Sequence, residues 1–259
     1  MTRTELNKLP IMELRSRAQG RAPEAGRDPY VGMTIRFLSI YLTKAFLRTQ
    51  ITPLQVTVAS VVFFLAGVLM FAWNEFSFDL YGIILIYVSI LLDGCNGELA
   101  RLLGYRPEIG SRYVEPISHD IQYGLMFIPL AIGAYGATGS VLVIYAAFVA
   151  TVAKLLNRFF IMRYDYTLAT NQKSVNTEGE AVIPYNPDVG FLHRTYRFLN
   201  RNFFSSVGLI VPLLVFTSVG RVDLFIWLFA IVYSGFALMH FYKQFRHISR
   251  IDTPLIPHD

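Results

Sequence analysis

The sequence predicts an all-α polytopic membrane protein, with six transmembrane helices and an N-terminal amphipathic helix lying in the membrane interface. The 259-residue chain is 54% hydrophobic and only 16% charged, and its mean hydropathy is +0.43. Apolar runs recur along the chain, and several reach the length of about 20 residues that one bilayer crossing needs. Short polar breaks separate these runs, so we expect the chain to cross the membrane several times.

The first predicted element is the interfacial helix, at about 30–48. Arg36, Lys44 and Arg48 interrupt its apolar residues at spacings that leave one polar face. The lengths of the apolar runs, and the polar, Gly and Pro residues that interrupt them, then place the six spans at about 53–73, 80–102, 111–136, 140–163, 203–220 and 223–246.

Two residues mark the start of the first span. Thr52 suits the N-cap position, and Pro53 suits the first turn of a helix. The membrane domain is therefore expected over 30–250, between a polar cytoplasmic segment at 1–29 and a cytoplasmic tail at 251–259.

The distribution of positive charge predicts the orientation. With a cytoplasmic N-terminus, Arg221 is the one residue among 23 Lys and Arg that falls in an outer loop. The positive-inside rule then puts both termini in the cytoplasm, and no cleavable signal is expected. We expect an integral multi-pass protein of a bacterial or archaeal cytoplasmic membrane. Contact with anionic membrane lipids accounts for the net charge of +5, and no basic, aromatic-interleaved groove indicates nucleic-acid binding.

A polar run, DGCNGELAR at 93–101, closes the second span. Ionisable groups at membrane depth are costly, so such a cluster is a candidate functional site. At about 100° per residue, one arc of the helix carries Asp93, Asn96, Gly97, Ala100 and Arg101, while Glu98 points elsewhere. Carboxylates suit a metal ion, small residues permit close approach, and arginine binds phosphate, so the arc suits a nucleotide or diphosphate. The single cysteine, Cys95, excludes an internal disulfide and is assigned to helix packing.

A second polar face begins the third span on the same side of the membrane. The residues that share this face are Ser111, Arg112, Glu115, Ser118, His119 and Gln122. Asp120 projects about 100° away from His119. Oxygen ligands suit Mg²⁺ or Mn²⁺, and a histidine ligand favours Mn²⁺ or another transition metal. The competing interpretation is a set of headgroup contacts or a structural ion pair. Two such faces on neighbouring antiparallel helices favour a site.

Two further regions keep two interpretations each. Lys154 and Arg158 lie four residues apart in the fourth span, where cations either bind an acceptor or lipid phosphate or extend toward the headgroups. The long polar loop at 165–202 is either a flexible connector or a lid over the site.

The segment LDGCNGELARLLGYRPEIGSRYVEPISHD resembles the signature of the CDP-alcohol phosphatidyltransferases, D-x-x-D-G-x-x-A-R followed by G-x-x-x-D-x-x-x-D. LRTQITPLQVT resembles the entry of that family into its first span. The resemblance implies a homodimeric, divalent-metal-dependent enzyme of phospholipid or related lipid biosynthesis. Such an enzyme transfers a phospho-alcohol or phosphatidyl group from a CDP-linked donor to an acceptor alcohol and releases CMP.

The four metal-binding aspartates of the family correspond here to Asp93, Asn96, Glu115 and His119. The motif therefore departs from the family pattern at three of these four positions. The resemblance assigns nucleotide binding to Gly97, Ala100 and Arg101, and Ser111 aligns with the second motif glycine. With neutral histidine the four metal positions carry two negative charges, which favours one divalent ion, or a second that arrives with the donor diphosphate. Asp93 and His119 are the predicted catalytic residues, with His119 as general base.

Two other function classes stay open. A relative of the family that binds nucleotide or lipid without turnover would also carry the altered motif. A transporter is disfavoured, because the polar residues gather at one membrane face rather than at the midplane. The residues name neither the acceptor alcohol nor which substrate is the lipid.

Overall fold

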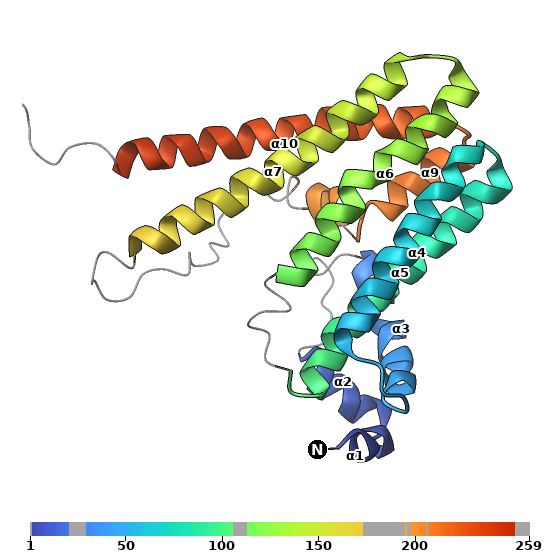
Figure 1. Ribbon diagram of the computed structural model, residues 1–259, viewed down its shortest axis with the longest axis vertical. Helices are drawn as coiled ribbons and strands as arrows, with labels where there is room; N and C mark the ends of the chain where they lie inside the picture. Colours follow the sequence, from blue (N-terminus) through green and yellow to red (C-terminus); the bar gives the residue numbers. More distant parts are fainter. Residues whose placement is uncertain are drawn as a thin grey trace, which may run out of the picture.

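The computed structural model describes residues 2–20, 30–105, 113–172, 195, 198–205 and 207–251, and nearly all of these residues form helices (Figure 1). Five helices in this part of the chain are long and apolar enough to cross a membrane: Pro53–Trp73, Phe76–Leu102, Glu115–Thr138, Leu142–Leu168 and Val222–Ser249. They correspond to α4 with η1, α5, α6, α7 and α10. The prediction of an all-α polytopic membrane protein is therefore confirmed.

The count of six spans is not confirmed. The predicted span at 203–220 contains α9 (Ile210–Ser218), whose nine residues extend only about 14 Å, against about 30 Å for a hydrocarbon core. A short π-helical segment, η3 (Asn200–Phe204), precedes it and ends in extended backbone at Ser205. Gly208 then packs so tightly that an added Cβ would lie 2.5 Å from the backbone of Asn202. An apolar run does not reveal this break in the helix.

Helices α4 (Pro53–Met70) and α5 (Phe76–Leu102) form a hairpin held by small residues. Thr52 and Gln55 form a capping box at the start of α4, as its predicted N-cap requires. Ser89 Oγ donates to the Ser60 carbonyl at 2.7 Å, and a Cβ on Gly67 would lie 2.7 Å from the Gly82 carbonyl. Such close contact leaves α5 little freedom to rotate, which fixes the face that its polar end presents.

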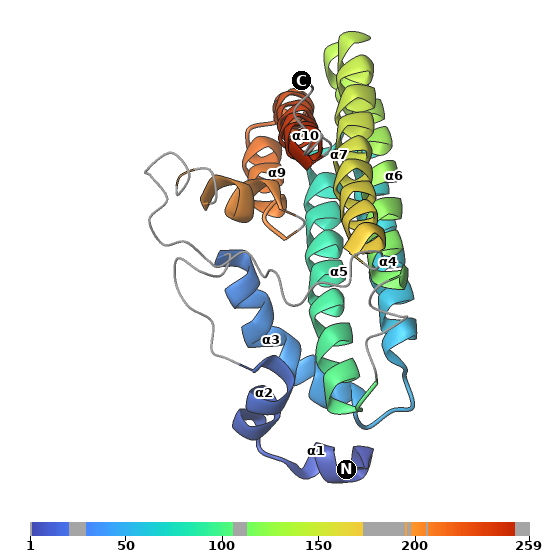
Figure 2. The ribbon, with the colours of Figure 1, turned by 90° about the vertical axis from the view of Figure 1, so that its left-hand side faces the viewer.

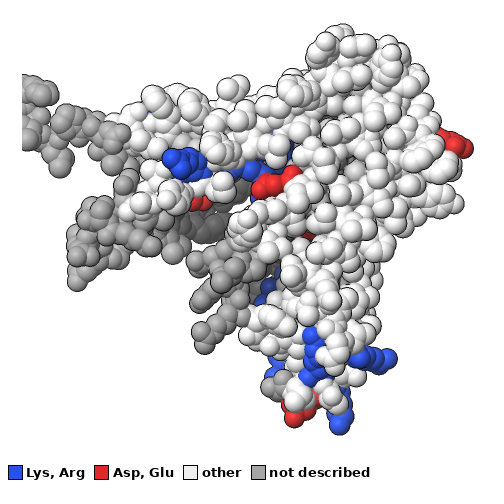
Figure 3. All heavy atoms as spheres, viewed as in Figure 1, with Lys and Arg blue, Asp and Glu red and all other residues white. Residues whose placement is uncertain are grey.

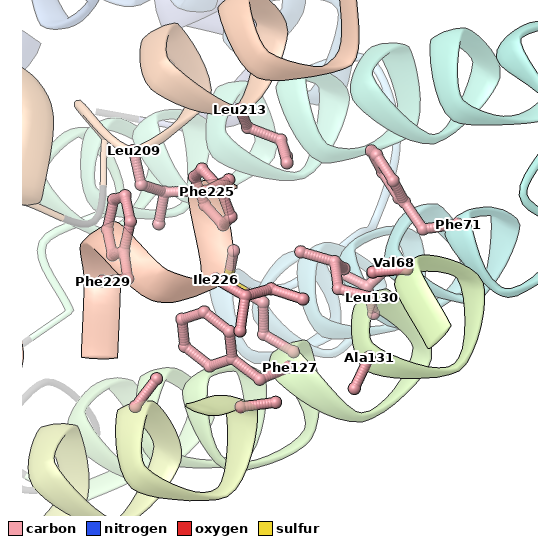
Figure 4. Close-up of a cluster of buried hydrophobic side chains, with 14 of the residues drawn as sticks. Val68, Phe71, Phe127, Leu130, Ala131, Leu209, Leu213, Phe225, Ile226 and Phe229 are labelled. Atoms are coloured by element: carbon pink, nitrogen blue, oxygen red, sulfur yellow. The ribbon is translucent and has the colours of Figure 1, made fainter. Parts of the chain in front are cut away.

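The apolar core joins this hairpin to α6 (Glu115–Thr138), α9 and α10 (Val222–Ile251). Phe127 of α6 lies against Phe225 and Phe229 of α10, and Leu130 lies near Val68 of α4 (Figure 4). Beyond this core, α7 (Leu142–Gln172) and α10 run side by side away from α4 and α5 (Figures 1 and 2). The core thus anchors the start of α6, which carries half of the predicted site.

The N-terminal segment, predicted only as polar, contains two helices that cover the polar face of α3 (Tyr30–Phe46). These are α1 (Arg3–Lys8) and α2 (Ile11–Gln19), which bury Leu6, Leu14 and Ala18. All three cations of the predicted interfacial helix contact this segment: Arg36 donates to the Gln19 carbonyl, Lys44 to the Leu9 carbonyl and Arg48 to Asn7 Oδ1.

Charged side chains concentrate at this N-terminal end of the molecule, whereas the flank formed by α4 to α6 is almost free of them on the face in view (Figure 3). A flank with few charged side chains is typical of a protein that crosses a bilayer.

Candidate metal and substrate site

The structure brings the two predicted polar faces together. Asp93 on α5 and Glu115 and His119 on α6 each offer a ligand atom, and these atoms lie within 4.8 Å of one another. His119 Nε2 lies 3.9 Å from Asp93 Oδ2, and both side chains keep about a quarter of their surface exposed, 20% and 28%. Two carboxylates this close repel each other unless a cation lies between them. Two carboxylates and an imidazole therefore form a group that could hold one divalent ion.

The orientation of His119 leaves one ring nitrogen facing the carboxylates. Its Nδ1 lies 3.3 Å from Gln122 Oε1, which can only accept a hydrogen bond, so Nδ1 carries the proton in this arrangement. The ring also stacks on Tyr123, with centroids 6.3 Å apart and planes at 26°. In a neutral imidazole of this tautomer, Nε2 carries a free electron pair on the side of Asp93. The sequence placed Gln122 on the same polar face as His119 but assigned it no role in the site.

A small cavity adjoins these residues. Its volume is about 20 Å³, which accommodates about one water molecule or one bare ion and excludes a larger substrate. The polar side chains that line it are Ser60, Ser89, Asp93, His119 and Gln122. A nucleotide or lipid headgroup would therefore have to bind outside this cavity.

The predicted nucleotide-binding arc is partly covered by the N-terminal segment. Arg101 Nε donates to the carbonyl of Ala18 in α2, and the Arg101 guanidinium lies 3.4 Å from where a Cβ on Gly97 would be. Asn96 and Ala100 lie on the same helix and are half-buried. Ser111 lies outside the described residues, as does most of the loop at 165–202.

Glu98 lies on the other side of α5 from the arc, where side chains of α2 and α3 surround it. Its side chain is only 2% exposed and accepts from Thr43 Oγ1 at 2.7 Å, from Gln19 Nε2 at 2.6 Å and from Ser39 Oγ. The prediction that Glu98 points away from the arc agrees with these contacts. The carboxylate instead connects α5 to α2 and α3.

The two α7 cations contact the site-bearing end of α6. Arg158 pairs with Asp120 and donates to the Pro116 carbonyl at 3.2 Å. Lys154 Nζ lies 4.4 Å from the ring centres of both Tyr123 and Tyr233. Asp120 is thus directed to α7 while His119 is directed to α5, as their 100° separation on the helix requires. Tyr233, on α10, carried no signal in the sequence.

No family model and no curated protein matches the chain. Solved structures do: the phosphatidylinositol phosphate synthase of Mycobacterium tuberculosis with CDP-DAG bound is 16% identical, with a TM-score of 0.54 over 80% of this chain and 94% of that one. The same synthase in complex with manganese and citrate is 17% identical, with a TM-score of 0.55 over 80% of this chain and 89% of that one. These neighbours are CDP-alcohol phosphatidyltransferases, so the chain has the fold that its motif resemblance implied.

Proposed function

We propose that this protein is a membrane transferase of phospholipid or related lipid biosynthesis. It moves a phospho-alcohol or phosphatidyl group from a CDP-linked donor to an acceptor alcohol, with release of CMP. The observation that carries the proposal is the convergence of Asp93, Glu115 and His119 from two helices to within 4.8 Å. The convergence occurs in a fold shared with a phosphatidylinositol phosphate synthase that binds CDP-DAG and manganese.

The donor set fits one divalent ion. Asp93 and Glu115 supply two negative charges and hard oxygen atoms, which suit Mg²⁺ or Mn²⁺. Asn96, one helical turn after Asp93, adds a neutral amide in place of a carboxylate. When bound, the ion would neutralise the charge that develops on the donor diphosphate.

His119 has one free nitrogen for two predicted tasks. Nδ1 faces Gln122, so Nε2 is the atom available either to bind the metal or to take a proton. We assign to Nε2 the proton of the acceptor hydroxyl, because the carboxylates already supply the charge and hard oxygens that Mg²⁺ prefers. Metal ligation by the same atom is the competing assignment, and a metal titration of a His119 variant distinguishes the two.

The surroundings of the site support a lipid substrate. A groove of about 480 Å³ runs between α3, α5 and α9, and it is lined almost entirely by apolar side chains. Tyr87 lines this groove and lies six residues before Asp93 on α5. The headgroup of a lipid whose acyl chain binds in the groove would therefore lie on the side of the metal site. Gly97, Ala100 and Arg101 are the proposed nucleotide contacts, and Lys154 and Arg158 the proposed phosphate contacts. We place this charged end of the molecule in the cytoplasm.

The decisive experiment measures CMP release by the purified protein. A panel of donors, CDP-diacylglycerol and CDP-linked headgroups among them, is combined with candidate acceptor alcohols in Mg²⁺ or Mn²⁺, and the lipid product is identified. We expect turnover with one donor class, lost in Asp93→Asn and Glu115→Gln. Glu13→Gln is the matched control, because Glu13 is an exposed carboxylate of α2 that pairs with Arg17. It is not one of the residues that converge at the candidate metal site. Full activity in excess chelator would contradict the proposal.

Binding without turnover is the second candidate function. The contact of Arg101 Nε with the Ala18 carbonyl favours loss of turnover, because it turns toward α2 a guanidinium that the resemblance assigns to the donor nucleotide. Donor binding without CMP release from any donor would establish it. A homodimer stays a prediction from the resemblance, which sizing in detergent tests.

A further inference from the structure

A second polar cavity lies at the opposite end of the helix bundle. Its volume is about 130 Å³, and it lies where α5 and α10 begin and where α6 and α9 end. Asp79 lines it and lies 14 residues before Asp93 on α5, which separates the two sites by about 21 Å along the helix. The cavity is therefore independent of the candidate transferase site.

Two buried oxygen atoms that line this cavity have no hydrogen-bond partner among the described residues. Asp79 is 8% exposed and Thr217 is 2% exposed, and Asp79 Oδ1 and Thr217 Oγ1 are the unpartnered atoms. Nearby hydroxyls behave differently: Thr138 Oγ1 donates to the Ala134 carbonyl and Ser218 Oγ to the Leu214 carbonyl. Buried polar groups are nearly always paired, so these two atoms are available to bind a ligand in the cavity.

The charges around the cavity define that ligand. Asp223 also lines the cavity, but its two carboxylate oxygens accept from Arg221 at 2.9 and 2.8 Å. Among the described residues, Asp79 has no such cation. A buried, ionised carboxylate without a partner is strongly unfavourable, and a single negative charge is balanced by a single positive one. Water in the cavity would satisfy the hydrogen bonds but not the charge.

We propose that this cavity binds a small monovalent cation such as Na⁺, with the Asp79 carboxylate as charged ligand and the Thr217 hydroxyl as neutral ligand. Carboxylate, hydroxyl and amide oxygens are hard donors suited to such a cation, and Asn74 lines the same cavity. Its volume admits the ion with several water molecules, each of which takes about 30 Å³. The bound ion joins the start of α5 to the end of α9, the short helix that the sequence predicted as a full span.

The test is the thermal unfolding of the purified protein in detergent. Na⁺ is exchanged for tetraethylammonium at constant ionic strength, and Mg²⁺ is held fixed so that the Asp93 site does not change. A ligand that binds the folded state raises the unfolding midpoint as its concentration passes the dissociation constant. We expect Na⁺ to raise the midpoint in this manner and tetraethylammonium, which is too large and cannot coordinate, to leave it unchanged.

Variants assign the effect to the cavity. Asp79→Asn removes the charged ligand and should abolish the Na⁺ response, while Thr217→Val should increase the Na⁺ concentration needed for half the response. Glu75→Gln is the matched control: it removes an exposed carboxylate four residues before Asp79 and should keep the full response. Line broadening of ²³Na in nuclear magnetic resonance, measured on the same samples, reports binding even where a variant is less stable.

Three results would overturn the proposal. One is an equal midpoint of the parent protein in Na⁺ and tetraethylammonium, which would mean that Asp79 is protonated and the cavity holds only water. The second is an Asp79→Asn protein that keeps the Na⁺ response. The third is a larger response to Ca²⁺ than to Na⁺ that Asp79→Asn removes, because a divalent ion contradicts the balance of a single charge.

Discussion

Asp93 and Glu98 are carboxylates on the same helix, five residues and about 140° apart, and their surroundings are opposite. Glu98 is 2% exposed and accepts hydrogen bonds from three side chains on α2 and α3. Asp93 is partly exposed, and its partners among the described residues are a second carboxylate and a histidine. A buried carboxylate supplied with donors stabilises the fold, whereas one placed beside other metal-binding groups is available for a ligand.

The largest difference is expected when the charge of Asp93 is removed. Asp93→Asn should reduce CMP release to background, because the site loses half of the negative charge that binds the divalent ion. Its unfolding midpoint should stay near that of the parent protein, because the Asp93 side chain has no hydrogen bond to any of the described residues. CMP release and thermal unfolding are measured on one preparation. Turnover of the Asp93→Asn variant above background would show that Asp93 is not required for catalysis.

His119 decides whether the Asp93 side of α5 also carries out proton transfer. His119→Ala should lower turnover by about 10² to 10⁴ with donor binding largely kept, which is the range for a general base. A Mn²⁺ titration of the residual activity is the second measurement. An unchanged half-saturating concentration supports the base, and a large increase assigns Nε2 to the metal instead.

Asp120→Asn is the control for His119. Asp120 lies one residue further along α6 but pairs with Arg158, so its loss should be milder than that of His119. The reverse order of severity would make Asp120 the functional acid of this helix.

On the other side of α5, the effect should be on stability. Glu98→Ala leaves the hydroxyls of Ser39 and Thr43 without their acceptor, at a cost on the order of 3 kcal/mol in the free energy of unfolding. Denaturation in detergent should show the loss, while CMP release per folded molecule should fall far less than in Asp93→Asn. Equal loss of activity in the two variants would break the distinction between the two carboxylates.

Helix periodicity was enough to predict most of this arrangement. The convergence of Asp93, Glu115 and His119 follows from 100° spacing on two antiparallel helices, and the Thr52 cap follows from residue type. The altered motif residues also resemble a family whose fold the chain shares.

Contacts between distant segments could not be predicted in this way. Arg101 binds a backbone carbonyl 83 residues away, and a carbonyl carries no residue signature. For the same reason, the sequence did not predict that α1 and α2 pack over α3, or that two aromatic rings lie beside Lys154. The break before α9 depends on close packing at Gly208 rather than on hydropathy.

Asn96 offers the mildest test of the Asp93 face. It stands where the resembled family has a metal-binding aspartate, one turn after Asp93 and on the same arc of α5. Asn96→Asp adds a third negative charge beside Asp93 and Glu115, which are already within 4.8 Å of His119 and of each other. Mn²⁺ should therefore bind about tenfold more tightly, a change of about 1.4 kcal/mol, measured by calorimetry without substrate.

The control for this variant is Glu98→Gln, which alters a carboxylate on the opposite side of α5 and should leave Mn²⁺ affinity unchanged. Without metal, Asn96→Asp should also lower the unfolding midpoint, because three carboxylates repel one another, and Mn²⁺ should restore it. Unchanged Mn²⁺ affinity in Asn96→Asp would place Asn96 outside the metal site. In that case the family's two-ion arrangement would not be recovered by restoring its aspartate, and the site would be built for one ion held by Asp93 and Glu115.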